Sequence, residues 1–217
     1  MIDKIKKTNK MKNSKKLIFA SLVLSFMSFT SAQAQEKTPS YGFKGGLNFS
    51  NFYTDNVDDS NILTGFNAGL YAKFPITNSI AIQPEINYTT KGSEQIYDNA
   101  VFQGTSKFNI NYIEVPVLLV ANLTDNFNVH VGPYAAYMVS GKTSTETNFG
   151  SSTSQLDTDD FNKFDAGISG GVGIDLDVVN FGVRYNYGLT KIGKDNNFTS
   201  SDAKNSVFNV YVGLRLN

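Results

Sequence analysis

The 217-residue sequence contains no cysteine and no tryptophan, and it has a single histidine. The absence of cysteine excludes disulfides, thiolate metal sites and a lipid anchor on an N-terminal cysteine. The formal net charge is zero, because 19 Lys and Arg residues balance 19 Asp and Glu residues. Without a basic surface, we expect no nucleic-acid partner. The length suits one domain of barrel or sandwich size.

Long apolar runs are scarce, and the longest lies near the N-terminus. Residues 17–32, LIFASLVLSFMSFTSA, follow a lysine-rich stretch and lead into the small-residue sequence AQA at 32–34. This run is shorter than the roughly 20 apolar residues of a spanning helix, and Ser and Thr interrupt it. The order predicts a signal peptide over 1–34, cleaved after Ala34, with Met1 or Met11 as the start. A short segment, 35–40, then precedes one domain over 41–217.

After Ala34 the sequence alternates with a period of two. In YGFKGGLNFS (41–50), apolar Tyr41, Phe43, Leu47 and Phe49 alternate with small or polar residues. Such alternation predicts strands with two unlike faces, and no segment has the spacing of an amphipathic helix. Eight strands are expected, at 41–50, 65–74, 80–91, 111–123, 127–140, 164–175, 179–190 and 206–217.

The connections between these strands alternate in length. Short turns are expected at 75–79, 124–126 and 175–177, and long polar loops at 51–63, 92–107, 141–162 and 191–205. Outer-membrane barrels have short turns on the periplasmic side and long loops outside. The pattern predicts an all-β fold, an eight-stranded antiparallel up-and-down transmembrane β-barrel.

A soluble barrel with its apolar face inward is the alternative. Many glycines occupy the polar face of the strands, among them Gly42, Gly46, Gly65, Gly69, Gly171, Gly182 and Gly213. Glycine weakens a strand, so a solvent-facing surface has no use for so many, whereas a crowded eight-stranded interior has little room for larger residues. Aromatic residues also gather toward both ends of the strands, as in the interfacial belts of membrane barrels. The apolar face is therefore expected to contact lipid.

The stretch NYIEVPVLLVANL (111–123) carries a glutamate and a proline inside an apolar run. Phe108, Ile110 and Tyr112, at even positions, are expected to face lipid. From Ile113 onward the apolar residues expected to face lipid stand at odd positions instead. This change predicts a β-bulge between Tyr112 and Ile113. Glu114 and Pro116 then point inward, and a bulge tolerates the missing donor of Pro116. Pro84 and Pro133 remain without this explanation.

An inward Glu114 needs a charged partner, because a lone buried carboxylate is costly. Strand counting places Glu85, Glu114, Arg184 and Lys44 at similar heights, and further inward cations include Lys73, Lys91 and Arg215. We expect an ion-pair network of Glu114, Glu85, Arg184, Lys44 and Arg215 that plugs the lumen.

Signals for catalysis or cofactors are weak. His130 falls on an inward position, so a membrane-embedded hydrolase of the Ser/His/acid type is conceivable. A lone histidine is also an ordinary lumen filler, and one histidine without cysteine cannot form a His/Cys metal cluster. The acidic groups at 55–59 and 157–160 lack the spacing of a calcium loop. We expect no enzyme activity, no metal and no cofactor.

Several motifs together resemble a known family. YGFKGGLNFS contains the pattern G-x-K-x-G-L-N, and NYIEVPVLLVANL contains Y-I-E-V-P. With VHVGPYAAYMVSG and DAGISGGVGIDL, they make the chain from Tyr41 onward resemble the PorT-like outer-membrane β-barrel family, often labelled the porin family. The resemblance implies an outer-membrane barrel in the envelope of a Gram-negative cell, and family members include a component of protein secretion.

Three functional classes remain open from the sequence. A structural or surface-interaction protein that presents four extracellular loops is the first, an accessory of protein secretion or assembly the second, and a hydrolase the third. The expected partners are outer-membrane lipid, the barrel insertion machinery and an extracellular or envelope protein bound through the four long loops.

Overall fold

The computed structural model describes residues 38–53, 61–98, 103–148, 150–156, 161–193 and 203–217. By contacts the chain divides into Met1–Glu36 and Lys37–Asn217, and the fold concerns the second unit. The predicted signal peptide and the first part of segment 35–40 lie outside the described residues. Within them, no helix has the length and apolar character needed to cross a membrane.

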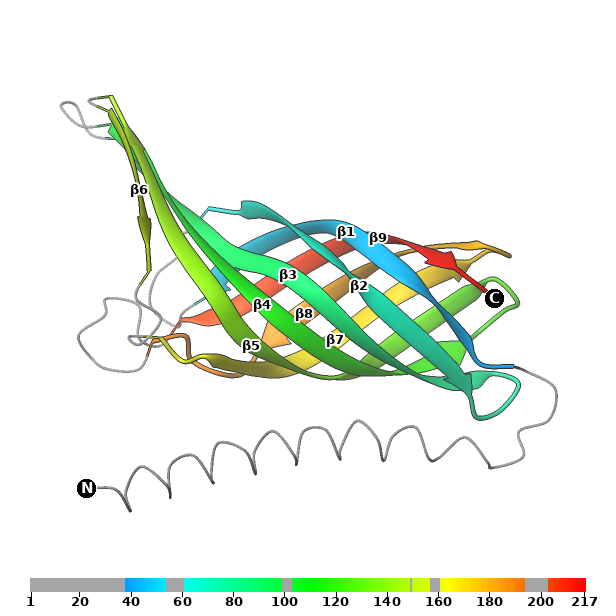
Figure 1. Cartoon of the computed structure of the whole chain (residues 1–217). Coiled ribbons are helices and arrows are strands. Elements are labelled where there is room, and N and C mark those ends of the chain that lie inside the picture. The colour runs from blue at the N-terminus through cyan, green and yellow to red at the C-terminus, as the bar shows by residue number, and fades with distance from the viewer. Residues whose placement is uncertain (1–37, 54–60, 99–102, 149, 157–160, 194–202) are drawn as a thin grey trace, which may run out of the picture. The chain divides into compact units, whose positions relative to one another are not determined.

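Nine β-strands make up the described fold, all joined in one antiparallel sheet (Figure 1). They are β1 (Ser40–Tyr53), β2 (Leu63–Pro75), β3 (Ile80–Asp98), β4 (Gln103–Asn122), β5 (Phe127–Thr147), β6 (Gly150–Gln155), β7 (Phe164–Asp175), β8 (Val179–Gly188) and β9 (Lys204–Arg215). Pairing of β1 with β9 and of β4 with β5 closes the sheet into a ring. The strand β6 stays outside the ring and, among the described strands, pairs only with β5.

The predicted count of eight strands is therefore corrected to nine. The extra strand lies inside the region 141–162 that was expected to be a loop, because β5 continues to Thr147 and the chain folds back on it. Gly150, with a φ of 148°, supplies the backbone conformation for this reversal, and the Thr147 hydroxyl donates to its carbonyl at 3.0 Å. The predicted loop 92–107 is shorter as well, since β3 extends to Asp98 and β4 begins at Gln103.

Three tight turns lie together at one end of the ring, called here the short-turn end, and the other end is the long-loop end. Threonine hydroxyls shape two of the turns: Thr77 accepts from the amide of Ile80 at 3.0 Å, and Thr124 accepts from that of Phe127 at 3.0 Å. Each turn also bonds to its neighbour, for example through the Asn122 amide and the Ser79 carbonyl at 2.7 Å. The ring thus has the predicted order of short and long connections.

The two faces of the ring are polar inside and apolar outside. Along β1, Phe43 and Leu47 each expose 53 % of their surface, whereas Lys44 and Asn48 are buried. Glycines make room for the inner side chains, since a Cβ at Gly182 would overlap the Tyr211 phenol. The outward apolar face confirms the predicted orientation and is the opposite of a soluble ligand-binding barrel.

The predicted bulge in β4 is wrong in its position. β4 keeps one phase throughout, so that Ile110 and Tyr112 are buried on the same inner face as Glu114. The register shifts between Asn111 and Tyr112, and the extra residue is Val139 of β5. Apolar side chains fit inside at this height because the interior near the long-loop end is apolar.

Pro84, Pro116 and Pro133 lie on three neighbouring strands at nearly the same height. Pro84 faces Val117, the residue after Pro116, and the β4–β5 pairing is interrupted where Val117 would face Pro133. The pairing of β2 with β3 is also interrupted beside Pro84. Grouping the prolines confines the missing backbone donors to one patch of the ring wall.

Candidate functional site

The interior of the ring holds most of the buried charge, and its first centre is Glu85. Lys44 of β1 donates to Glu85 Oε1 at 2.8 Å, and Arg184 of β8 binds both carboxylate oxygens at 2.8 and 2.9 Å. The amides of Gln83 and Asn87 donate to the same carboxylate. This Glu85 cluster of Lys44, Glu85 and Arg184 brings together three residues of the predicted network.

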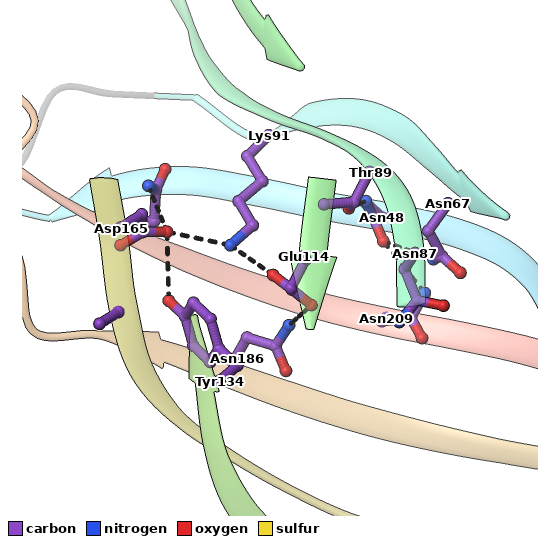
Figure 2. A network of polar contacts seen from close by, with 12 residues as sticks. Asn48, Asn67, Asn87, Thr89, Lys91, Glu114, Tyr134, Asp165, Asn186 and Asn209 are labelled. Atoms are coloured by element: carbon purple, nitrogen blue, oxygen red, sulfur yellow. Dashed lines mark hydrogen bonds and ion pairs between the residues drawn. The ribbon is translucent and has the colours of Figure 1, made fainter. Parts of the chain in front are cut away.

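Glu114 belongs to a second centre, nearer the long-loop end. Lys91 Nζ lies 2.6 Å from Glu114 Oε2 and 3.0 Å from Asp165 Oδ2, with none of the Lys91 side chain exposed. Asn186 donates to Glu114, and Tyr134 donates to Asp165 (Figure 2). Asn205 also donates to Asp165, at 3.0 Å. The predicted single network is thus split, and Glu114 is placed in a Lys91 cluster of Lys91, Glu114 and Asp165.

Aromatic rings lie against both sets of cations. Lys44 Nζ lies 4.2 Å from the centre of the Tyr211 ring, and Lys91 Nζ lies 4.3 Å from that of Tyr134. A ring face attracts a nearby cation, most strongly where water is excluded. The tyrosines therefore support the buried cations in addition to filling the interior.

A set of asparagine side chains, called here the amide layer, lies between the two clusters. Asn48 donates to Thr89 at 2.8 Å, and its Oδ1 accepts from Asn67 at 2.8 Å and from Asn209 at 3.0 Å (Figure 2). Asn87 and Asn186 connect this layer to Glu85 and Glu114. The amide layer consists of Asn48, Asn67, Asn87, Asn186 and Asn209. Sequence reasoning missed it by considering only charged partners, although each asparagine stands at an inward position of an alternating strand.

Arg215, the remaining predicted member, lies apart from both clusters at the short-turn end. There Lys73 donates to Asp175 at 2.8 Å and to Asn122 at 3.2 Å, and Asn128 also donates to Asp175. The described residues place no carboxylate within ion-pairing distance of Arg215.

An apolar cluster occupies the interior near the long-loop end. Phe161, Ile192 and Ala203, from the segments beside β7, β8 and β9, pack against residues of the ring. The cluster comprises Ile110, Tyr112, Tyr134, Ala136, Met138, Phe161, Ile192 and Ala203. It is the reason why Ile110 and Tyr112 can face inward.

Little free space remains between these groups. One small cavity lies at the short-turn end beside Lys73 and Arg215, and another is lined by the Glu85 cluster, the amide layer and Glu114. Each has about 10 Å³ open to the centre of a water molecule, which is the room of a single water.

Among the described residues, the side chains considered for catalysis from the sequence are engaged by their neighbours. Arg184 Nε donates to His130 Nε2 at 3.4 Å, so His130 is held with its proton on Nδ1, 3.2 Å from the Asn128 carbonyl oxygen. Glu85 and Glu114 are engaged by separate cations. Among the described residues, no group of three or more His, Cys, Asp or Glu side chains could hold a metal ion. The acidic loop groups at 55–59 and 157–160 lie outside the described residues.

An apolar outer face around a closed, charged interior defines a membrane-embedded β-barrel. Residues 32–194 match the model of the family described as outer membrane protein beta-barrel domain, which is more than half of the chain. The chain belongs to this family and is an outer-membrane β-barrel protein. No curated protein is similar enough in sequence to count as a relative.

Solved structures of outer-membrane proteins are similar to the chain. The attachment invasion locus protein Ail of Yersinia pestis is 14 % identical, with a TM-score of 0.47 over 83 % of this chain and 100 % of that one. Neisserial surface protein A is 14 % identical, with a TM-score of 0.48 over 82 % and 99 %. OprG of Pseudomonas aeruginosa is 12 % identical, with a TM-score of 0.36 over 82 % and 94 %.

Proposed function

We propose that the protein is a small transmembrane barrel with a plugged lumen that presents its long-loop end for contact with other molecules. The eight strands of the ring form an up-and-down barrel, with the short-turn end in the periplasm and the long-loop end outside. Residues 1–34 act as the signal peptide, and the insertion machinery places the barrel in the membrane. Among barrels of this family, we further propose that it is PorT-like.

The proposal that the lumen is plugged rests on the side chains that fill the interior of the ring. The Glu85 cluster, the amide layer and the Lys91 cluster follow one another along the lumen, and the apolar cluster covers the last. An eight-stranded barrel has an interior that side chains just fill. Two small cavities among these groups each have about 10 Å³, the room of a single water, which supports the plug. A structural and binding role therefore fits the interior better than transport or catalysis.

The observation that carries the interaction role is the strand β6. Figure 1 shows β3, β4 and β5 continuing past the other strands at the long-loop end, with β6 beside β5. All six residues of β6 are exposed, and within the part of the chain that the structure describes they pair only with residues 142–147 of β5. An unpaired strand edge is a template on which an extended segment of another protein can add a strand. The Ser- and Thr-rich sequence GSSTSQ gives this edge polar side chains and no charge.

A proline in β6 tests this role. Thr153→Pro removes a backbone donor from β6 and prevents regular pairing, whereas Ser152→Ala, on the neighbouring residue, preserves the strand. In a deletion strain complemented with each variant, we expect surface attachment to fall with Thr153→Pro and to be retained with Ser152→Ala. Equal attachment by both complemented strains and by the deletion strain would contradict the proposal.

The same strains separate the second candidate function. If the protein is an accessory of secretion or assembly, the deletion blocks delivery of other proteins to the cell surface. In that case Thr153→Pro should restore delivery as well as the wild type does, because the barrel itself remains intact.

A further inference from the structure

Positive charge exceeds negative charge in the half of the lumen nearest the short-turn end. Four cations lie there among the described residues, Lys44, Lys73, Arg184 and Arg215, against the two carboxylates Glu85 and Asp175. Glu85 is shared by Lys44 and Arg184, and Asp175 is taken by Lys73. Both carboxylates are therefore already engaged, and Arg215 is left without one.

Arg215 lies in a small cavity that offers further hydrogen-bonding groups. Arg215 lines the short-turn cavity with Ser40, Tyr71, Lys73 and Asn180, and the carboxylate of Asp175, which Lys73 engages, belongs to the same lining. Asn180 donates to the Tyr71 hydroxyl at 2.9 Å. The Nε atom of Arg215 is buried and has no hydrogen-bond partner among the described residues. A buried donor without a partner is costly, so a ligand or water that accepts from it is favoured.

The acidic residues of the turns at this end do not supply the missing partner. Asp125 and Asp177 lie in the turns at this end, but both are exposed and neither forms an ion pair with Arg215. At the opposite end of the lumen the balance is reversed, since Lys91 faces both Glu114 and Asp165 beneath the apolar cluster. An anion is therefore favoured only at the short-turn end.

We propose that the short-turn cavity binds an oxyanion group, a carboxylate or a phosphate, through Arg215 with help from Lys73. A guanidinium presents parallel N–H donors that match the oxygens of these groups. The cavity of about 10 Å³ admits one oxygen of the ligand and leaves the rest at the mouth. That the cavity faces the periplasm rests on the proposed orientation of the barrel. Binding of the oxyanion does not depend on that orientation.

Titration of the full chain, purified from membranes in a nonionic detergent, tests the site with sodium phosphate and sodium acetate as probes. Ionic strength is held constant with sodium chloride, and NMR shifts of the Arg215 Nε–H signal and of amides around the cavity are followed. We expect saturable shifts with both probes. Arg215→Gln should weaken the binding seen at the remaining amides about tenfold or more, since it removes charged hydrogen bonds.

A matched variant controls for charge alone. Lys142→Gln removes one cation from an exposed position of β5 near the long-loop end and should bind phosphate as the wild type does. If Arg215→Gln does not fold, as judged by heat-modifiable gel migration, Lys73→Gln replaces it and should weaken binding in the same direction. Shifts that fail to saturate, or binding that Arg215→Gln and Lys73→Gln leave unchanged, would overturn the proposal.

The source of the oxyanion is distinguished in nanodiscs. With zwitterionic lipid, added free phosphate should shift the Arg215 signal if small anions are bound. With a share of anionic phosphatidylglycerol and no free phosphate, the same shift would identify a lipid headgroup. The attachment assay with Thr153→Pro tests β6 at the long-loop end, whereas the titration tests the cavity at the short-turn end. Failure of either proposal therefore leaves the other intact.

Discussion

The two charged clusters of the lumen have opposite stoichiometry. In the Glu85 cluster one carboxylate is held by two cations, and in the Lys91 cluster one cation is held between two carboxylates. Both are buried, so the attraction within each must offset the cost of removing charges from water. The central residue is thus an anion, Glu85, in one cluster and a cation, Lys91, in the other. The stability of the two clusters should therefore respond differently to loss of the central charge and to pH.

Loss of the Glu85 charge should have the largest effect. Glu85→Gln leaves Lys44 and Arg184 buried beside each other without an anion. Arg184 keeps its proton, so only loss of the Lys44 proton can relieve the repulsion, and a falling pH opposes that loss. We expect the free energy of unfolding to fall by about 3–5 kcal/mol, measured by urea titration in lipid vesicles. Glu146→Gln, at an exposed position of β5, is the control and should unfold as the wild type does. Equal stability of the two variants would show that the cluster does not stabilise the barrel.

Loss of the Lys91 charge should be somewhat smaller and dependent on pH. Lys91→Met leaves Glu114 and Asp165 without their cation, but one of the two carboxylates can take up a proton, which removes the like-charge repulsion. We expect a loss of about 2–4 kcal/mol near neutral pH that shrinks as the pH falls, relative to wild type at the same pH. The loss caused by Glu85→Gln should not shrink in this way. The same pH dependence in both variants would contradict the comparison.

Truncation of Glu114 should have a smaller effect, because Lys91 keeps its second anion. In Glu114→Ala the ion pair between Lys91 and Asp165 at 3.0 Å can remain. A loss of about 1–3 kcal/mol is expected from the missing charged hydrogen bonds. Thermal unfolding in detergent measures it, with Asn186→Ala as the companion that removes only the neutral donor to Glu114 and should cost less.

Coupling between the clusters should be the smallest effect. The amide layer lies between them, and no ion pair joins one cluster to the other among the described residues. The changes caused by Glu85→Gln and Lys91→Met should therefore add in the double variant to within about 0.5 kcal/mol. A larger interaction energy would mean that the lumen behaves as the single network expected from the sequence.

The orientation of the two faces could be predicted because every alternating strand shows the same pattern, with small or polar residues on one face and apolar residues on the other. Glycines stand where Tyr211, His130 and other inner side chains need room, and outward positions such as Phe43 and Leu47 carry no polar group. Partners were harder to predict. Lys44, Glu85 and Arg184 meet as strand counting suggested, but Glu114 lies above them with Lys91, because the tilt and stagger of strands change heights across the ring.

Two features gave no usable signal in the sequence. The strand β6 is exposed on both faces, so its residues have no apolar alternation, and only its pairing with β5 makes it a strand. In β4, Ile110 and Tyr112 are apolar residues that face inward because residues far away in sequence, such as Phe161 and Ile192, cover that part of the lumen. A pattern read along one strand cannot reveal what other segments place against it.

Single-channel recording in planar bilayers tests most directly the claim that the barrel is closed by its own side chains. The purified protein, shown to be folded and inserted by heat-modifiable gel migration, should give no large, steady conductance. Large, steady conductance steps from the wild-type protein would contradict a lumen filled by the Glu85 cluster, the amide layer and the Lys91 cluster.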